Sequence, residues 1–417
     1  MKPRTLIALS LLSFSLLACK REAAPAAAPA TGDYAVQPWE LFAGPGSMAP
    51  DLTATADGRL LLSWLSKVEG RRTALQFASY TDAGGWQSQP RTIAVGNSLI
   101  ANWADTPHLL VTPDGAMWAQ WLQANDSGPS AYDVVLARSR DGGMNWPQMT
   151  RVNQQGTGTY SGFATLWAAA ADRVGIAWLD GSGKTAGGHD GHDGGGDMQL
   201  RSNGYDMDLT AGEAATLDPR SCDCCQTDVA LTARGPLLAW RGRSDTEIRD
   251  ILVARLDAGS WTSPKPVHAD KWKTDACPVN GPAITASGTQ AIVAWYSEGD
   301  GAPAVRIARS SDSGDSFAAP VVVERGQAVL GRVDAAIDGD QAWVAWLRED
   351  STRQTLMLAL YSADLGKELQ RLEVAQLQGR GRATGFPKLV VHGGVAWLVW
   401  TDVIDGVAQL KGARVTR

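Results

Sequence analysis

The chain has 417 residues, 44% of them hydrophobic and 20% charged, and its formal net charge is −6. This composition is typical of a globular protein, and the acidic balance excludes a nucleic-acid-binding protein, which needs a basic surface to neutralise phosphates. The chain is long for one hydrophobic core, so either two domains or a repeat architecture is required. Seventeen Trp and 45 Gly favour many short strands joined by tight turns.

The N-terminus carries an export signal. Lys2 and Arg4 precede an apolar stretch from Leu6 to Leu17, which is too short to cross a bilayer as a helix. The stretch ends in the sequence LLAC at Cys19, which resembles the lipobox of bacterial lipoproteins. The resemblance implies that residues 1–18 are a signal peptide and that Cys19 becomes lipidated. The alternative is an ordinary signal peptide followed by a chance cysteine.

Residues 19–33 are predicted to be a lipid-anchored tether. They are rich in Ala and Pro and have no large apolar side chain, so they cannot build a core. Acyl chains on Cys19 would hold the protein at a membrane surface. By resemblance to Gram-negative lipoproteins, Lys20 in place of Asp favours the outer membrane. We therefore expect a monomeric cell-envelope protein that faces the periplasm or the surface, with residues 34–417 as its folded domain.

An internal repeat determines the fold prediction. A short apolar run that ends in Trp recurs seven times at intervals of 51 to 62 residues. Each run lies between an upstream strand with a glycine-bearing turn and two downstream strands, which gives a four-stranded antiparallel meander of about fifty residues. Such units repeated around an axis form an all-β propeller. The Trp residues that end the runs are Trp64, Trp121, Trp178, Trp240, Trp295, Trp346 and Trp400.

The two ends of the chain complete each other. The last unit ends at Arg417 after its third strand, and residues 34–42 read as a strand without a unit of its own. Pairing this N-terminal strand with the last unit would remove an exposed edge and close the ring. We predict seven blades, with six as the alternative.

The turn after the third strand carries a second signature, S-x-D-x-G followed by an aromatic residue. Asp can accept hydrogen bonds from turn amides, Gly permits positive φ, and the aromatic ring packs under the hairpin. Three further blades have degenerate versions. These turns resemble the Asp-box of the sialidase superfamily, a structural device without catalytic meaning. The two full matches contain Ser139, Asp141, Gly143 and Trp146, and Ser310, Asp312, Gly314 and Phe317.

Strand direction divides the loops between two faces. The loops between blades and the loops after second strands share one face, here called the first face, and the short turns and Asp-box-like turns lie on the opposite face. The unusual segments all belong to the first face. One is a glycine-rich insertion with His189 and His192, and the others are the loops with Cys222, Cys224 and Cys225 and with Cys277.

The four cysteines beyond Cys19 are predicted to meet. Cys222 and Cys277 both lie 18 residues before the Trp of their blade, so they occupy matching positions in neighbouring blades. In an oxidising compartment two disulfides are expected, and three connectivities are open. One alternative is a thiolate site for a soft metal ion, Cu(I) or Zn²⁺, helped by His189 or His192. Free or redox-active thiols are the other alternative.

Other polar residues of the first face form either a solvated rim or a pocket at the axis that binds a polar or anionic ligand. Those singled out are Arg241, Tyr296, Glu298, Arg332, Arg348 and Arg382.

The sialidase resemblance covers residues 34–417 but assigns no catalytic residue. Sialidases use three arginines, a Tyr–Glu pair and an Asp, and their R-I-P motif is absent from this sequence. They are also six-bladed. We therefore favour a binding module for a glycan, an envelope protein or a metal ion over a divergent exo-glycosidase, for which Tyr296 and Glu298 are the suggestive pair. Handling of copper or zinc by the C-x-C-C loop is a further alternative.

Overall fold

The computed structural model describes residues 33–70, 72–87, 89–128, 131–153, 159–184 and 196–417. The chain divides into two compact units, and the unit from Tyr34 to Thr416 contains every strand. Cys19, the signal peptide and the tether up to residue 32 lie outside the described residues, as do His189 and His192. Within the described part, no helix has the length and apolar character needed to cross a membrane.

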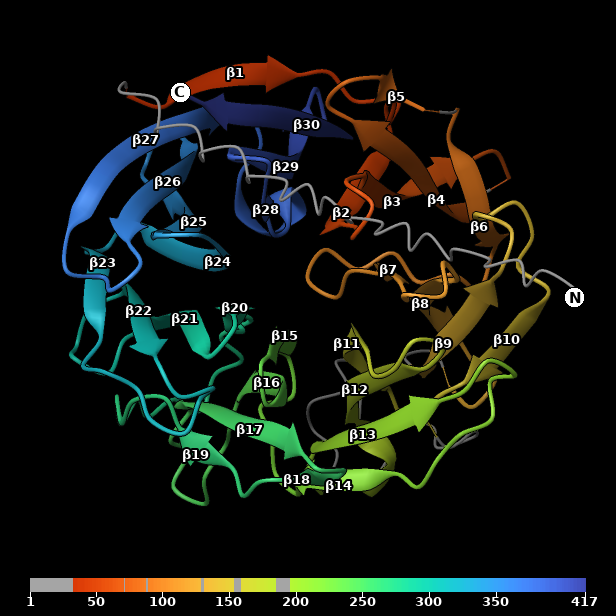
Figure 1. Cartoon of the computed structure of the whole chain (residues 1–417), viewed down its shortest axis with the longest axis horizontal. Helices are drawn as coiled ribbons and strands as arrows, with labels where there is room; N and C mark the ends of the chain where they lie inside the picture. Colours follow the sequence, from red (N-terminus) through yellow and green to blue (C-terminus); the bar gives the residue numbers. More distant parts are fainter. Residues whose placement is uncertain (1–32, 71, 88, 129–130, 154–158, 185–195) are drawn as a thin grey trace, which may run out of the picture. The chain divides into compact units, whose positions relative to one another are not determined.

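Seven antiparallel sheets follow one another around an axis in chain order (Figure 1). Blade 1 consists of β2 (Ser47–Ala54), β3 (Leu60–Val68), β4 (Arg72–Thr81), β5 (Gly85–Trp86) and β6 (Arg91–Gly96). Blade 2 consists of β7 (His108–Val111), β8 (Met117–Ala124), β9 (Tyr132–Ser139) and β10 (Gln148–Arg151). Blade 3 consists of β11 (Gly162–Ala168), β12 (Val174–Asp180), β13 (Gln199–Tyr205) and β14 (Ala215–Asp218). Blade 4 consists of β15 (Asp228–Thr232), β16 (Gly235–Arg241), β17 (Ile251–Asp257), β18 (Ser260–Trp261) and β19 (Lys265–Pro266).

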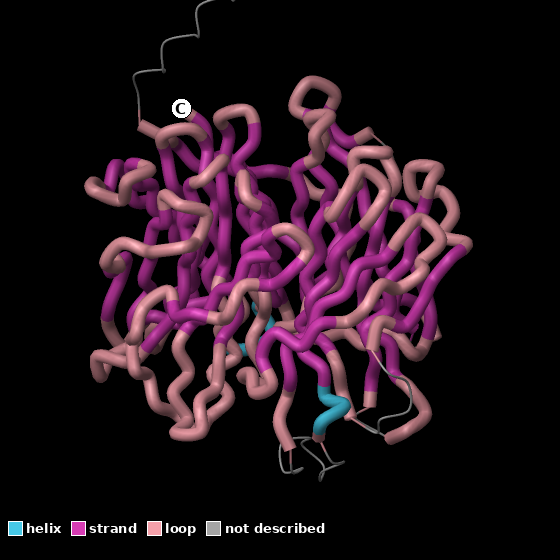
Figure 2. The backbone as a smooth tube through the Cα atoms, turned by 60° about the horizontal axis from the view of Figure 1, so that its bottom comes forward, coloured by secondary structure: helices cyan, strands magenta, loops and turns pink. Residues whose placement is uncertain are grey.

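Blade 5 consists of β20 (Ala283–Ser287), β21 (Gln290–Ser297), β22 (Ala304–Ser310) and β23 (Val321–Arg325). Blade 6 consists of β24 (Val329–Asp338), β25 (Gln341–Glu349), β26 (Gln354–Ser362) and β27 (Glu368–Leu377). Blade 7 combines β28 (Lys388–His392), β29 (Val395–Ile404), β30 (Val407–Thr416) and β1 (Ala35–Trp39). Two short 3-10 helices, η1 (Gly181–Gly183) and η2 (Gly381–Thr384), lie in loops of the first face. Figure 2 shows η1 among the loops that extend from one end of the strands.

The N-terminal strand closes the ring, as predicted. β1 pairs antiparallel with β30 from Ala35 opposite Thr416 to Trp39 opposite Gly412. Trp39 also packs edge-on against Trp397 of the same blade, with ring centroids 4.8 Å apart. The prediction of seven blades is therefore confirmed, and the six-bladed alternative is wrong.

The repeated Trp residues anchor the second strands between neighbouring blades. All seven are between 0% and 6% exposed. Because a buried indole N–H needs an acceptor, several of them donate to a buried acid. Trp178 donates to Asp180 at 2.8 Å, Trp240 to Asp218 at 2.8 Å and Trp295 to Asp270 at 2.6 Å. In these three blades the repeated Trp therefore contributes both apolar burial and a hydrogen bond to an acid.

The turns that match the full S-x-D-x-G pattern have the hydrogen bonds expected of them. Asp141 accepts from the hydroxyl of Ser139 at 2.8 Å and from the amide of Asn145 at 2.9 Å, and these bonds help to lower its pKa to about 2. Gly143 has φ +80°, and a Cβ there would meet the ring of Phe77 at 2.4 Å. Asp312 accepts from Ser310 in the same way, at 2.7 Å. These residues stabilise hairpins.

Replacing Trp240 with Ala should lower the free energy of unfolding by about 3–5 kcal/mol, because it leaves a cavity and removes the donor to Asp218. Chemical denaturation followed by Trp fluorescence and circular dichroism measures the change. Leu231→Ala is the control, because Leu231 belongs to the same blade and is 51% exposed. Equal stability of the two variants would contradict the assignment of Trp240 to the core.

Candidate functional site

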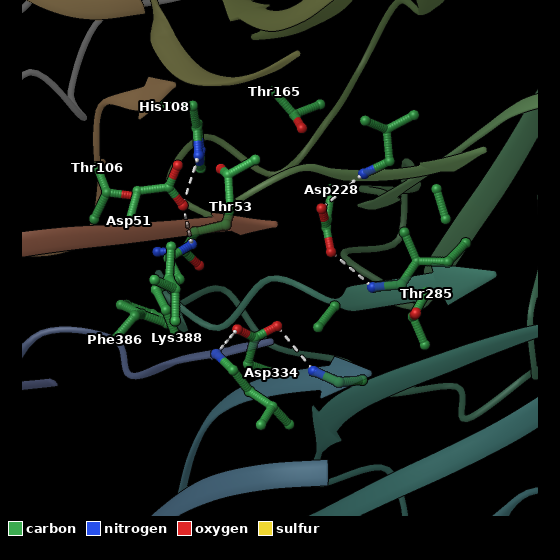
Figure 3. A pocket seen from close by; sticks show the side chains of 18 of the residues that line it. Asp51, Thr53, Thr106, His108, Thr165, Asp228, Thr285, Asp334, Phe386 and Lys388 are labelled. Atoms are coloured by element: carbon green, nitrogen blue, oxygen red, sulfur yellow. Dashed lines mark hydrogen bonds and ion pairs between the residues drawn. The ribbon is translucent and has the colours of Figure 1, made fainter. Parts of the chain in front are cut away.

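A polar pocket of about 470 Å³ lies on the axis, lined by the innermost strand of every blade (Figure 3). Five charged or titratable side chains reach it from equivalent positions of β2, β7, β15, β24 and β28. They are Asp51, His108, Asp228, Asp334 and Lys388. Sequence reasoning missed this set. The signal was present in three blades, where the residue stands between Pro and Leu in the sequences PDL, PHL and PKL of the innermost strand.

The pocket carboxylates tie adjacent blades together. Asp51 accepts from the amide of Leu109 in the next blade at 3.3 Å. Asp228 accepts from Ile284 and Asp334 from Leu389, both at 2.7 Å. Nearer the first face, Asp105 accepts from Phe163 at 2.7 Å. Four of the seven blade junctions therefore carry the same carboxylate-to-amide bond, which satisfies backbone donors that would otherwise be buried unpaired.

The pKa values of these carboxyl groups differ with their partners. Burial raises the pKa of Asp105 and of Asp334 to about 7, and it also raises the pKa of Asp228. Burial acts on Asp51 too, but His108, Lys388 and the amide of Leu109 outweigh it and lower the pKa. The Asp51 carboxylate lies 3.3 Å from Nδ1 of His108 and 3.8 Å from Nζ of Lys388. Dashed lines join Asp51 to both side chains in Figure 3.

The pocket is closed at the first face. Gln226 reaches across it, donating to the carbonyl of Ala104 at 2.6 Å and accepting from the amide of Gly281 at 2.9 Å. Trp103 and Phe386 stack with centroids 5.9 Å apart. Lining residues at this end are buried, whereas Ala54 and Leu231 at the other ends of their strands are exposed. The pocket is therefore reached from the opposite face, and not from the first face as the sequence suggested.

Two of the predicted ligand-face arginines are buried and serve the backbone. Arg241 is 2% exposed and donates to the carbonyls of Asn280, Arg249 and Tyr296 at 2.6–2.9 Å. Arg332 is 4% exposed and donates to Thr384 and Gly385. Its guanidinium lies 4.8 Å above the ring of Trp103, and burial lowers its pKa to about 10. Neither is available to clamp a ligand carboxylate.

The remaining candidates do not converge on the axis. The hydroxyl of Tyr296 donates to Glu298 at 2.6 Å, and burial together with that carboxylate raises the Tyr296 pKa. Tyr361 and Glu368 form a similar pair at 2.7 Å, so the pairing is not unique in the fold. Arg348 pairs with Glu324 at 3.0 Å, and Arg382 is exposed. None of these residues lines the axial pocket.

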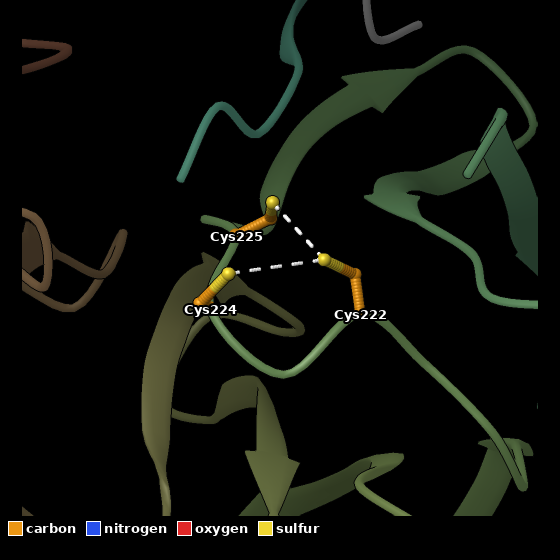
Figure 4. Close-up of side chains that lie close together, drawn as sticks. All are labelled: Cys222, Cys224 and Cys225. Atoms are coloured by element: carbon orange, nitrogen blue, oxygen red, sulfur yellow. Dashed lines mark hydrogen bonds between the residues drawn. The ribbon is translucent and has the colours of Figure 1, made fainter. Parts of the chain in front are cut away.

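The four cysteines of the propeller meet on the first face, as their matching offsets predict. Cys224 is bonded to Cys277, with Cα atoms 6.1 Å apart. Cys222 and Cys225 are free thiols whose sulfurs lie 3.3 Å apart, and the sulfur of Cys222 lies 4.0 Å from that of Cys224 (Figure 4). The structure therefore holds one disulfide here and a buried dithiol beside it.

An arginine-rich network surrounds the dithiol. Arg249, which is 3% exposed, donates to the sulfur of Cys222 at 3.3 Å and to Glu247 at 2.7 Å. The hydrogen bond from Cys225, with the charges of Arg249 and Arg241, outweighs burial and lowers the pKa of Cys222 to about 6. Burial raises the pKa of Cys225. The two thiols therefore differ strongly in acidity.

The same sulfurs have a spacing that suits a soft metal ion. In the part of the chain that the structure describes, Cys222, Cys224 and Cys225 form the single group of potential ligands within 4.8 Å of one another. Because Cys224 is bonded to Cys277, a site with three or four thiolates would first require reduction of that disulfide.

Known structures with this fold include carbohydrate-active proteins. The polysaccharide lyase Uly1 superposes with a TM-score of 0.52 at 8% identity, covering 89% of this chain and 90% of that chain. The endosialidase of phage phi92 gives 0.50 at 12% identity, covering 92% and 69%. The microbial sialidase Hz136 gives 0.42 at 14% identity, covering 72% and 63%. No protein-family model matches the chain. No curated protein matches it in sequence. At these identities the matches to the lyase and the endosialidase show a shared β-propeller fold.

Replacing Asp105 with Asn should flatten the dependence of stability on pH. The folded-state pKa of Asp105 is about 7, above its unfolded value, so its ionisation lowers stability as pH rises from about 4 to about 7. Asn keeps an acceptor for the Phe163 amide and has no charge to bury. Thermal unfolding between pH 4 and pH 8 measures the slope. A slope as steep as that of the native chain would show that Asp105 is not the titrating group.

Proposed function

We propose that this protein is a cell-envelope binding module that holds the acidic end of a carbohydrate chain in its axial pocket. The observation that carries the proposal is that a histidine and a lysine, His108 and Lys388, share a polar cavity of about 470 Å³. Volumes of this order are typical of small-ligand sites. Each of the two side chains is 22% exposed, so both can be reached by a ligand.

The pocket presents Lys388 and His108 beside carboxyl groups whose pKa values are raised. Asp51 orients His108 and Lys388 through its carboxylate, at 3.3 Å and 3.8 Å. Asp334, with a pKa of about 7, is largely uncharged below that pH, and the pKa of Asp228 is also raised. Lys388 Nζ and His108 are the groups of the pocket that a sugar carboxylate or sulfate would contact. Thr53, Thr165 and Thr285 supply further hydrogen-bonding groups for sugar hydroxyls.

The same pocket favours binding over glycoside cleavage. A glycosidase needs two carboxyl groups free to exchange protons or to attack. Both oxygens of Asp228 accept backbone amides, from Val229 at 2.8 Å and from Ile284 at 2.7 Å. Asp334 is engaged in the same way by Ala335 and Leu389. These carboxyl groups are used as structural acceptors, and Tyr296 with Glu298 lies outside the pocket.

The comparisons support carbohydrate as the ligand class. The lyase and the endosialidase with the same fold are both named for action on saccharide chains. We extend only the ligand class to this chain, because sequence identities of 8% and 12% do not carry over individual pocket residues.

Replacing Lys388 with Ala should weaken binding of trigalacturonic acid at least ten-fold at pH 6.5, because the variant removes the cation nearest to the ligand acid. Isothermal titration calorimetry measures the dissociation constant, with maltotriose as the neutral probe. Lys388→Arg should retain binding, and Lys271→Ala is the control because Lys271 is an exposed lysine remote from the pocket lining. Equal affinity of the native chain and the Lys388→Ala variant would refute the site.

We further propose that Cys19 anchors the module to the envelope through its acyl chains, with residues 20–33 as the tether. Replacing Cys19 with Ser should release the protein from membranes into the soluble envelope fraction. Fractionation with immunoblotting, together with metabolic labelling by a fatty acid, measures the change. Membrane association of the Cys19→Ser variant equal to that of the native chain would contradict the anchor.

A further inference from the structure

A C-x-x-C dithiol lies against a disulfide on the first face. Cys222 and Cys225 have the spacing of redox-active dithiols, and their sulfurs are 3.3 Å apart. The sulfur of Cys222 is also 4.0 Å from that of Cys224, which is bonded to Cys277. Four sulfurs are therefore in a chain of contacts, with the attacking distance already close to van der Waals contact.

The two ends of this chain of contacts differ in exposure. Cys222 and Cys225 are 1% and 2% exposed, and Cys224 is 7% exposed. Cys277 is exposed, in the loop between β19 and β20. Reagents from solvent can therefore reach the disulfide from the Cys277 side, whereas the dithiol can be reached only through the protein.

Contacts around Cys222 hold it in place as a nucleophile. Its amide donates to the carbonyl of Arg241 at 3.0 Å, and its sulfur accepts from Arg249 at 3.3 Å. Glu247 fixes Arg249 through a 2.7 Å bond. A guanidinium bonded to sulfur stabilises the thiolate, which is the form that attacks disulfides.

We propose that these four cysteines form an internal thiol–disulfide exchange site, in which the Cys222 thiolate attacks the sulfur of Cys224 and releases Cys277 as an exposed thiol. This inference is independent of the carbohydrate site, which lies on the axis and opens on the opposite face.

The exchange is balanced without an external oxidant or reductant. The Cys222 thiolate forms a bond to Cys224, the Cys224–Cys277 bond breaks, and its electron pair leaves on Cys277. Cys225 then loses its proton and attacks the sulfur of Cys222, which releases Cys224 as the second leaving thiolate. The proton from Cys225 passes to Cys224, and water protonates Cys277. One disulfide and two thiols are present before and after, with the disulfide moved to Cys222–Cys225.

The consequence is a switchable thiol on the first face. In one state Cys277 is bonded to Cys224 and two thiols are buried. In the other state the buried pair is oxidised and Cys277 is free to react with a thiol or disulfide of another exported molecule. The two electrons that reduce the Cys224–Cys277 disulfide thus come from the buried dithiol of Cys222 and Cys225.

The experiment uses the full-length chain, purified without reductant and incubated with N-ethylmaleimide. Trypsin places Cys222, Cys224 and Cys225 in residues 221–234 and Cys277 in residues 274–306. Mass spectrometry of the native chain should show loss of the cross-link between these peptides over time, alkylation of Cys277, and a disulfide within residues 221–234. Alkylation traps the exchanged state, so the rate of Cys277 labelling reports the exchange.

Two matched substitutions separate the roles of the buried thiols. Cys222→Ser should slow alkylation of Cys277 at least ten-fold, because the attacking thiolate is lost. Cys225→Ser is an equally buried change whose hydroxyl can still donate a hydrogen bond to the sulfur of Cys222. It should still release Cys277 but stop at a Cys222–Cys224 bridge. Arg249→Gln should move the pH profile of the rate to higher pH, and Arg249→Lys should restore it in part, which a merely structural role would not do.

Three results would overturn the proposal. The first is a native chain whose Cys224–Cys277 cross-link persists while the fold is intact, a measurement that needs no variant. The second is alkylation of Cys277 in Cys222→Ser at the native rate, in a variant with the native circular dichroism spectrum. The third is purified protein with stoichiometric copper or zinc and four metal-bound thiolates, which would make the cluster a soft-metal site instead.

Discussion

The structure depends on closure of the ring by pairing of β1 with β30. Each blade exposes two apolar faces, and the only way to cover both is to stand between two other blades. An open ring would leave one face of two blades in water and a strand edge unpaired. Ala35 lies opposite Thr416, so the first and last strands share one sheet, and the repeated Trp residues of all seven blades are buried in the closed ring.

Closure also creates the chemistry of the axis. It brings seven innermost strands together, and backbone amides at their junctions need acceptors. The carboxylates of Asp51, Asp105, Asp228 and Asp334 fill that role at four junctions. The same carboxylates make the pocket polar and place an acid beside His108 and Lys388. Asp51, Asp228 and Asp334, which tie the blades together, therefore occupy the same position of the repeat as His108 and Lys388, and the five side chains face one pocket.

The sequence predicted the fold because its signals are local and repeated. Trp-ended runs, glycine turns and Asp-box-like turns each recur at the same place in a blade, and the missing strand at one end matched the surplus strand at the other. It also predicted that Cys222 and Cys277 approach each other. It did not predict that Cys224 is the partner of Cys277, since three connectivities satisfy the same offsets.

The sequence failed where function depends on neighbours around the ring. Arg241 ends β16 and Arg332 was expected in a loop before a first strand, yet both turn inward to backbone carbonyls of adjacent blades. Gln226 was not singled out, although it closes the axis by joining loops of blades 2 and 5. The axial residues had only a weak signal, the Pro before three of them. Contacts such as those of Gln226 join blades that are far apart in the sequence, and they leave no repeated pattern in it.

Ring closure by the two chain ends has a consequence for biogenesis. β1 precedes the other six blades in the chain and its partner β30 follows them, so β1 stays unpaired until those blades have been synthesised. Six blades can assemble from local hairpins, but the seventh is completed by a contact between the most distant segments, which is the slowest kind to form. The ring of a nascent chain would therefore stay open until β30 is made. A truncation that removes β30 would leave β1 without its partner strand and blade 7 incomplete.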